Sequence, residues 1–249
     1  MKHHLFISDL HLDAHRVDIV ACFLQFLRDT APQAEALYIL GDLFEAWVGD
    51  DDPAPYLSPI KTALRACTDA GCPIYCMRGN RDFLMGPRFF AETGCQELSD
   101  PTVIDLYGKS TLLMHGDDLC TLDKKHMRFK RTVHSPWRCW MRFGRHSLKK
   151  RQALAEKARH ASKNHTATAP DHILDVTPQA VTDIMEQYRT SLLIHGHTHR
   201  PAVHELTVSG QPAERVVLGS WGRLGNALRY DTTGAYRLIA VPPAPHNTV

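Results

Sequence analysis

Short apolar segments that alternate with helical patterns constrain this chain more than any other feature. Helical patterns around Ile19 to Leu27 and Ile60 to Ala70 separate the first three segments. Such alternation is typical of α/β proteins, whose strands are buried on both faces. The five segments run from His4 to Ser8, Ala36 to Leu40, Pro73 to Met77, Thr111 to Met114 and Ser191 to Ile194. The sequence therefore predicts an α/β fold built on these strands.

Every one of these segments ends in polar residues that can bind a metal ion. Ligands in open α/β sheets bind beyond the carboxyl ends of the strands, so these side chains can converge on one crevice. Carboxylate, imidazole and amide donors without a thiolate suit Mn²⁺, Fe²⁺, Zn²⁺ or Co²⁺. Seven ligands are too many for one ion and predict two ions that share a bridging carboxylate. The candidates are Asp9, His11, Asp42, Asn80, His115, His197 and His199.

Each candidate also has an ordinary structural explanation. A single Asp or His after a strand is more often a cap or a satisfied polar group than a ligand. The ordered series D-x-H, G-D-x-x-E, G-N-x-D, H-G and G-H-x-H, each after an apolar run, is much harder to obtain by chance. We therefore favour a metal site.

Positive charge is concentrated in one segment of the chain. Lys124 to His165 holds 14 of the 29 Lys and Arg residues and a single acid, Glu156. Apolar residues such as Met127, Phe129 and Leu148 recur there with helical spacing, which predicts amphipathic helices. The segment fits a solvated helical insertion, a nucleic-acid surface or a lipid-facing lid.

Composition limits the class of protein. Among the 249 residues no apolar run approaches the roughly 20 residues that span a bilayer. A carboxylate at Asp9 comes too early for a signal peptide, so we expect a cytosolic chain. The seven cysteines include no C-x-x-C pair, so we expect buried thiols instead of a disulfide framework.

The ordered motifs resemble those of the calcineurin-like metallophosphoesterases. The similarity is carried by Asp9-Leu10-His11, Gly41-Asp42, Gly79-Asn80, His115-Gly116 and Gly196-His197-Thr198-His199. It implies that one ion is held by Asp9, His11, Asp42 and His199, and the other by Asp42, Asn80, His115 and His197. Asp42 is the expected bridge.

The resemblance also implies a fold. It is a four-layer αββα sandwich with two mixed sheets, classed as α/β (α+β), in one domain over residues 1–249. A basic, aromatic helical lid insertion is expected at about residues 123–168. Antiparallel strands of the second sheet are expected at Val203 to Val208, Arg215 to Leu218 and Tyr236 to Val241.

Arg81 departs from a pattern common in the superfamily. Many members carry His after the Asn of the third motif, where this chain has Arg81. A histidine can protonate a leaving group, but an always-charged guanidinium cannot. We therefore expect Arg81 to bind phosphate oxygens, which fits a leaving group that is already good, such as the phosphate of a pyrophosphate.

A narrower resemblance concerns the substrate. Gly79 to Phe83, Glu45 to Asp51, His195 to Pro201 and the basic insertion are similar to enzymes that hydrolyse UDP-2,3-diacylglucosamine in lipid A biosynthesis. This similarity implies two Mn²⁺ ions, water attack on the α-phosphorus, and release of UMP and the diacylated sugar 1-phosphate. It also implies that the insertion holds the acyl chains at the cytoplasmic face of the bacterial inner membrane, as in a peripheral membrane protein.

The resemblance assigns roles to individual residues. Catalytic roles fall to Arg81, Asp42 and His115, and substrate contacts to Asn80, Arg81, Asp123, Ser162, Thr166 and His197. Thr166 stands where relatives are expected to carry Asn, and Ala169 where they are expected to carry Lys, so Lys163 or Asn164 are alternative contacts. Asp123 can instead cap the helix that starts near it, and Ser162 can be a plain surface residue.

Two other functions remain open at this stage. Another dimetal phosphodiesterase or a nuclease would keep the metal site and use the basic segment to hold phosphates of nucleic acid. A non-catalytic module would use the metals only to stabilise the fold. We favour the lipid substrate and expect no nucleic-acid partner. We also expect a monomer, because no long apolar stripe with heptad spacing appears.

Overall fold

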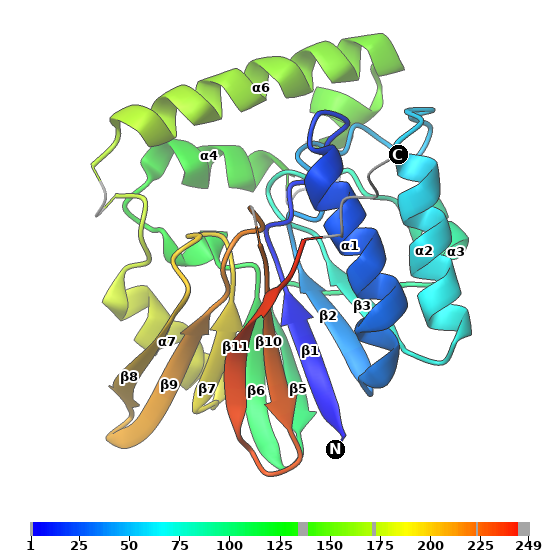
Figure 1. The fold of residues 1–249 in the computed structure, drawn as a ribbon. Helices are drawn as coiled ribbons and strands as arrows, with labels where there is room; N and C mark the ends of the chain where they lie inside the picture. The colour runs from blue at the N-terminus through cyan, green and yellow to red at the C-terminus, as the bar shows by residue number, and fades with distance from the viewer. Residues whose placement is uncertain (1, 134–138, 171–172, 223, 244–249) are drawn as a thin grey trace.

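Two β-sheets and the helices that cover them make up the structure, a computed structural model that describes residues 2–133, 139–170, 173–222 and 224–243 (Figure 1). The strands are His3–Ile7 (β1), Ala36–Leu40 (β2), Ile74–Met77 (β3), Gln96–Leu98 (β4), Thr102–Leu106 (β5), Lys109–Met114 (β6), Leu192–His195 (β7), Ala202–Val208 (β8), Gln211–Val217 (β9), Gly225–Asp231 (β10) and Tyr236–Val241 (β11). The α-helices are Val17–Asp29 (α1), Leu57–Asp69 (α2), Pro87–Thr93 (α3), Lys124–Val133 (α4), Leu148–Thr168 (α6) and Pro178–Tyr188 (α7). Shorter helices are Ala31–Gln33 (η1), Asp117–Leu119 (η2) and a π-helix, Trp140–Gly144 (η3).

Both sheets are mixed, as expected. The first sheet has the strand order β11-β10-β1-β2-β3-β4, in which β1 to β4 run parallel, β10 runs antiparallel to β1, and β11 runs antiparallel to β10. The second sheet has the order β5-β6-β7-β9-β8, in which β6, β7 and β9 run parallel. The carboxyl ends of β1, β2 and β3 therefore share one edge of their sheet, and those of β6 and β7 share one edge of theirs.

Alternating side chains along the strands build three apolar layers. On β1, Leu5 and Ile7 pack with α1, α2 and α3 on the outer face, whereas Phe6 faces the other sheet. On β7, Leu193 packs with α7, whereas Leu192 and Ile194 face the first sheet. Both faces of these strands are buried, which explains why their sequences read as nearly continuous apolar runs. The layer order is helices, sheet, sheet, helix, and the predicted four-layer αββα sandwich is confirmed.

The expected placement of the last three strands was wrong in part. β8 and β9 lie in the second sheet, but β9 runs parallel to β7, and only its pairing with β8 is antiparallel. β11 lies at the edge of the first sheet, paired with β10. A short turn from Asp231 to Ala235 joins β10 to β11, so β11 must lie beside β10, which pairs with β1. No strand was expected at β10, although its pairing with β1 and β11 places β11 in the first sheet.

The basic segment forms helices that cross one end of the sandwich. In its described parts it folds into α4, η3 and α6, and α6 lies across the end towards which β1 points (Figure 1). Polar contacts hold α6 to the loops beneath it: Arg151 pairs with Asp51 at 2.8 and 2.5 Å, and Arg159 pairs with Asp13 at 3.3 Å. The same loops carry candidate metal ligands, so α6 lies over the expected site.

Two further expectations concern membranes and thiols. Across the described ranges, no helix combines the length and apolarity needed to cross a bilayer. All seven cysteines are free, and six of them are buried. The expectation of buried thiols is confirmed.

Candidate metal centre and active site

The seven candidate ligands lie on five loops that follow β1, β2, β3, β6 and β7. Contacts between the loops bring the two sheets together at this edge. The backbone N–H of His197 donates to Asp9 Oδ2 at 2.8 Å, and Nδ1 of His115 lies 2.9 Å from the carbonyl oxygen of Leu40, at the end of β2. The candidate ligands therefore gather where the edges of the two sheets meet, and not at the edge of a single sheet.

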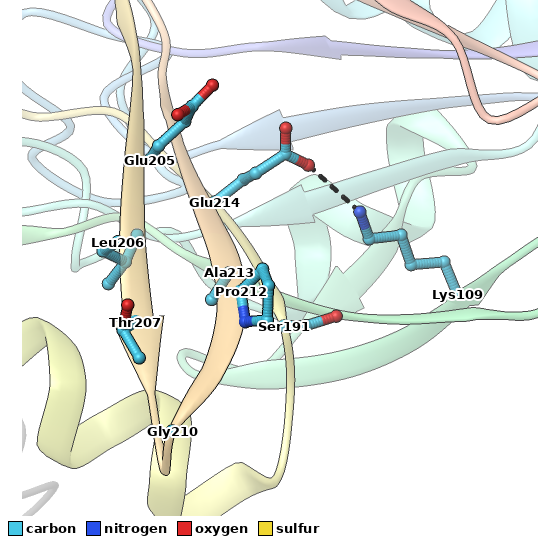
Figure 2. A pocket seen from close by; sticks show the side chains of 9 residues that line it. All are labelled: Lys109, Ser191, Glu205, Leu206, Thr207, Gly210, Pro212, Ala213 and Glu214. Atoms are coloured by element: carbon cyan, nitrogen blue, oxygen red, sulfur yellow. Dashed lines mark hydrogen bonds and ion pairs between the residues drawn. The ribbon is translucent and has the colours of Figure 1, made fainter.

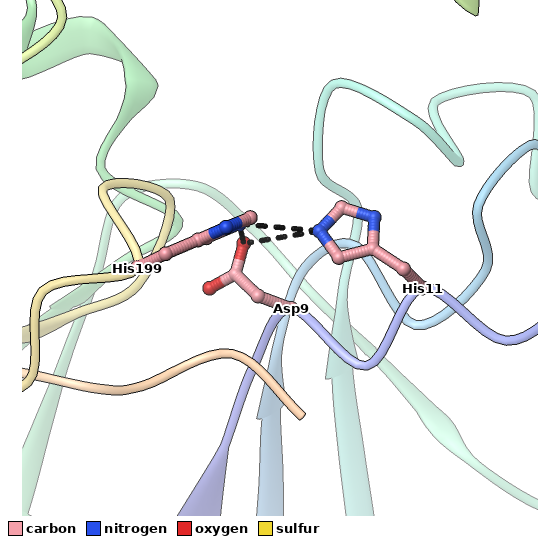
Figure 3. A group of neighbouring side chains, drawn as sticks. All are labelled: Asp9, His11 and His199. Carbon is pink, nitrogen blue, oxygen red and sulfur yellow. Dashed lines mark hydrogen bonds and ion pairs between the residues drawn. The ribbon is translucent and has the colours of Figure 1, made fainter. Parts of the chain in front are cut away.

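One group of ligands consists of Asp9, His11 and His199 (Figure 3). Nε2 of His199 lies 3.2 Å from Nε2 of His11 and 3.2 Å from Oδ1 of Asp9. Asp9 and His11 are buried, while His199 is exposed. Two imidazole nitrogens and a carboxylate oxygen thus face one point, as the ligands of a divalent ion do.

A second group surrounds the other side of Asp42. Oδ1 of Asp42 lies 3.8 Å from Nε2 of His115, which is 3.0 Å from Oδ1 of Asn80. Oδ2 of Asp42 lies 4.0 Å from Nε2 of His11, in the first group. The two oxygens of Asp42 therefore face different groups of donors. This is the arrangement that a bridging carboxylate between two ions requires.

His197 extends the second group. Its ring lies beside that of His115, with the centroids 5.1 Å apart. Burial, followed by the charge of His115, holds the pKa of His197 well below its ordinary value. A neutral imidazole has a lone pair to offer, so His197 is suited to bind a cation.

The charge of the site also fits a cation. Burial alone would lower the pKa of His115, but the carboxylates of Asp42, Asp117 and Asp9 outweigh it and raise this pKa to about 9. Burial would raise the pKa of Asp9, yet its hydrogen bond to His199 and the nearby imidazoles hold it well below its ordinary value. The buried carboxylates therefore stabilise positive charge, which a divalent ion supplies.

The backbone of the ligand loops is strained. Positive φ angles occur at five non-glycine ligands: Asp9 (55°), His11 (51°), Asp42 (52°), His197 (68°) and His199 (58°). Such conformations cost roughly 1–3 kcal/mol each and persist where the surroundings enforce them. Five of them in one crevice mark a site that is organised for function.

Two motif glycines allow the ligands to approach the backbone. A Cβ at Gly79 would lie 2.2 Å from Oδ1 of Asp42, and a Cβ at Gly196 would lie 2.4 Å from Oδ2 of Asp9. No side chain fits at these distances. Glycine is therefore required at position 79 by the close approach of Asp42, and at position 196 by the close approach of Asp9.

The substrate-contact candidates are divided between the core and the helices. The Arg81 guanidinium donates to Ser162 Oγ on α6 at 3.1 Å, and its backbone N–H donates to Asp42 Oδ1 at 2.8 Å. Ser162 is therefore not a plain surface residue. Thr166 lies one turn further along α6, with an exposed side chain, and Lys163 and Asn164 are exposed as well.

Asp123 has the capping role that sequence left open. Its Oδ1 accepts the backbone N–H of His126 at 2.9 Å, in the first turn of α4. Its Oδ2 lies 2.8 Å from Nε2 of His165 on α6. Asp123 thus joins the two helices of the basic segment, and a cap at Oδ1 leaves Oδ2 directed towards α6.

Two buried polar residues near the ligands had no predicted role. Asp82 is buried and accepts the backbone N–H groups of Gly79 at 2.7 Å and Leu43 at 2.8 Å, which joins the second and third ligand loops. Burial, followed by the charge of Asp42, raises the pKa of Asp82 to about 6. His195 is also buried and lies 3.1 Å from Nη1 of Arg215. A signal was present for Asp82, because it completes the G-N-x-D series.

A third acidic group, Asp100, Asp117 and Asp118, lies beside this site. The ammonium of Lys130, on α4, forms ion pairs with Asp117 and with Asp118, the latter at 2.6 Å. Lys130 therefore already supplies the positive charge that these carboxylates need. The group anchors α4 and is not counted as a metal site.

A surface recess lies at the opposite end of the second sheet. It has a volume of about 620 Å³, and Lys109 and Glu214 form an ion pair of 3.1 Å in its wall (Figure 2). Lys109 begins β6 and Ser191 precedes β7, whereas the ligands follow the other ends of these strands. This recess is therefore separate from the candidate metal centre.

Comparisons with known proteins agree with the geometry. The model of the family described as calcineurin-like phosphoesterase matches residues 3–201. A relative from Coxiella burnetii named UDP-2,3-diacylglucosamine hydrolase is 50% identical over 240 residues, which cover 96% of this chain and 98% of the relative. A relative of the same name from Pseudomonas aeruginosa is 52% identical over 231 residues, which cover 92% and 95%. The chain therefore belongs to the calcineurin-like phosphoesterase family, in the branch that contains these relatives.

Proposed function

We propose that this protein hydrolyses the pyrophosphate bond of UDP-2,3-diacylglucosamine to UMP and 2,3-diacylglucosamine 1-phosphate (lipid X), a step of lipid A biosynthesis. The position of Arg81 carries the proposal. Its backbone is bound to the central carboxylate of Asp42, and its guanidinium reaches Ser162 on α6. A phosphate-binding group thus lies between the candidate metal centre and the basic helices. The names of the relatives at about 50% identity support the same substrate.

The proposed cofactor is a pair of Mn²⁺ ions. We assign one ion to Asp9, His11, Asp42 and His199, and the other to Asp42, Asn80, His115 and His197. The mixture of carboxylate, imidazole and amide donors suits Mn²⁺ and needs no thiolate. When bound, the ions would supply Lewis-acid activation of a water molecule for attack on the α-phosphorus.

The residues of the chain then orient the substrate and stabilise charge. Arg81 binds the phosphate oxygens, on which negative charge grows during phosphoryl transfer. The sugar phosphate is a good leaving group, so a permanently charged guanidinium at this position serves better than a proton donor. Asn80 and His197 can contact the phosphates beside the metals, and Asp42 and His115 hold the centre to which the α-phosphate binds.

We assign the helices of the basic segment to the lipid part of the substrate. Lys124, Lys149, Lys150, Lys157 and Lys163 are exposed on α4 and α6. Each basic residue near an anionic membrane contributes on the order of 1 kcal/mol to binding. We therefore propose peripheral contact with the cytoplasmic face of the inner membrane. Asp123, Ser162 and Thr166 line the proposed path from the metals to the acyl chains.

The rival function is that of another dimetal phosphodiesterase or a nuclease, with the same lysines bound to nucleic acid. The two functions differ in product and in salt dependence. Nucleic-acid affinity that falls steeply with salt, together with cleavage, would favour the nuclease. Release of UMP as the sole nucleotide product would favour the lipid substrate. We propose a monomer, which light scattering of the metal-loaded protein in detergent would test.

The experiment is a product analysis. Metal-stripped protein is incubated with UDP-2,3-diacylglucosamine in mild detergent, with and without added Mn²⁺, and Asn80→Ala is assayed in parallel. The proposal expects Mn²⁺-dependent release of UMP that is lost in the variant. Absence of UMP, together with hydrolysis of a generic phosphodiester, would support the assignment of the metal centre and overturn the assignment of the lipid substrate.

A further inference from the structure

Glu45 lies between a candidate metal ligand and the candidate phosphate-binding residue. Its Oε2 is 3.1 Å from Nδ1 of His11, and its Oε1 is 3.8 Å from Nη1 of Arg81. The two oxygens of one carboxylate thus face two groups that come from different motifs. The Glu45 side chain is about one-fifth exposed, so these contacts are largely shielded from water.

The backbone fixes Glu45 opposite His11. Past the ends of β1 and β2, the backbone N–H of His11 donates to the carbonyl of Asp42 at 3.1 Å, and that of Leu12 donates to Leu43 at 3.0 Å. The N–H of Glu45 then donates to the carbonyl of Leu12 at 3.0 Å. These bonds continue the register of the two strands into the ligand loops, so the contact between Glu45 and His11 follows from the fold.

At His11, the carboxylate determines which nitrogen is free. Nδ1 faces the Glu45 carboxylate, which favours a proton on Nδ1 and leaves the lone pair on Nε2. Nε2 is the atom that lies 3.2 Å from His199 and 3.9 Å from Asp9. Glu45 lies on the Nδ1 side of the ring, so it orients the ligand without being a ligand itself. Outer carboxylates of this kind fix a metal-binding imidazole and raise its basicity.

At Arg81, the same carboxylate limits the orientation of the guanidinium. The Arg81 backbone is held by Asp42 Oδ1 and by the N–H of Trp47, which donates to its carbonyl at 3.1 Å. Nη1 faces Glu45 and Nη2 donates to Ser162, so both terminal nitrogens of the Arg81 guanidinium have a neighbour that limits its orientation. The groups are connected in the order His11, Glu45, Arg81 and Ser162, from the metal centre to α6.

We infer that Glu45 is a positioning residue that couples metal binding at His11 to the orientation of Arg81. The inferred effect on Arg81 rests on the proposed function, whereas the inferred effect on metal binding at His11 does not. Removal of Glu45 frees the His11 ring and leaves the Arg81 guanidinium without its carboxylate neighbour. Both effects arise from one side chain, which is not assigned as a metal ligand or as a substrate contact.

Two variants separate these effects from misfolding. Glu45→Ala removes both contacts, whereas Glu45→Gln keeps the length and an oxygen that can accept the His11 proton but removes the charge beside Arg81. Asp13→Asn is the control, because Asp13 lies on the same loop as His11 and pairs with Arg159 of α6 without contact to Arg81. Thermal unfolding of each metal-stripped variant verifies the fold.

The first measurement is Mn²⁺ affinity by calorimetry, without substrate. We expect Glu45→Ala to weaken the affinity by roughly 10- to 100-fold, Glu45→Gln to weaken it less, and Asp13→Asn to leave it unchanged. Wild-type affinity in a folded Glu45→Ala protein would overturn the role at His11. Because no substrate is present, an error in the proposed substrate cannot affect this result.

The second measurement is a double-mutant cycle on kcat/KM with saturating Mn²⁺. The variants are Glu45→Ala, Arg81→Ala and the pair, assayed with the UDP-linked lipid and with bis(p-nitrophenyl) phosphate. If Glu45 acts through Arg81, the loss in the pair is smaller than the product of the single losses. Multiplicative losses with both substrates would overturn the coupling. Activity on bis(p-nitrophenyl) phosphate alone would count against the lipid substrate, but the coupling between Glu45 and Arg81 could still be measured with that ester.

Discussion

A methyl group at position 196 should disable the metal centre without unfolding the protein. In Gly196→Ala, the new Cβ would lie 2.4 Å from Oδ2 of Asp9 and 2.3 Å from Oγ of Ser8. Ordinary contact begins at 3.4 Å, so the carboxylate must retreat by about 1 Å. The same oxygen accepts the backbone N–H of His197 at 2.8 Å, so its displacement also disturbs the fifth ligand loop.

The size of the effect follows from this displacement. A shift of about 1 Å in a catalytic group can cost roughly 10²-fold in rate, and disturbed ligand geometry costs roughly 10- to 100-fold in metal affinity. We expect losses of this order in Mn²⁺ affinity by calorimetry and in kcat at saturating Mn²⁺. Gly222→Ala is the matched control, because a Cβ there meets no atom within 4 Å. Wild-type affinity and turnover in Gly196→Ala would refute the reasoning.

Three further predictions concern charge, packing and pH. Arg81→Ala should keep wild-type Mn²⁺ affinity and lose turnover. Arg81→Lys should restore little of the turnover, because an ammonium cannot bind phosphate oxygens in a bidentate manner. Full turnover in either protein would contradict the role of Arg81 in binding phosphate. Ile194→Ala, in the layer between the sheets, should lower the free energy of unfolding in urea by about 2–5 kcal/mol, whereas Val203→Ala, at a 47% exposed site, should change it by less than about 0.5 kcal/mol. Burial lowers the pKa of His4, so the unfolded chain binds more protons than the folded chain below about pH 6.5, and the free energy of unfolding falls as pH falls. In His4→Gln the free energy of unfolding should therefore depend less steeply on pH in that range. A slope identical to that of the wild-type protein would contradict the prediction.

The candidate ligands could be predicted because their signal is local. Each follows a short apolar run, and the carboxyl ends of parallel strands share an edge, so Asp9, Asp42 and Asn80 are expected near one another without knowledge of the full topology. The structure brings all seven candidates to one crevice. The distribution of that crevice over two sheets entered only through the family resemblance, because a strand segment does not reveal its partners.

Other features depend on long-range contacts and leave little trace in sequence. β11 is in the first sheet because β10 pairs with β1, across more than 200 residues of chain. Asp82 holds two ligand loops through backbone N–H groups, which sequence does not display. The docking of α6 depends on ion pairs from Arg151 and Arg159 to distant loops, so composition predicted a basic helix but not its position.

The proposed reaction is the attack of water on the α-phosphorus of a UDP-linked lipid, at a centre where Asp42 would hold both metal ions. The most direct measurement is mass spectrometry of the products formed from UDP-2,3-diacylglucosamine in ¹⁸O-water with added Mn²⁺, with Asp42→Ala in parallel. We expect one ¹⁸O atom in UMP, none in the lipid phosphate, and no product from Asp42→Ala. Label in the lipid phosphate, or Mn²⁺-dependent UMP release by Asp42→Ala, would contradict it.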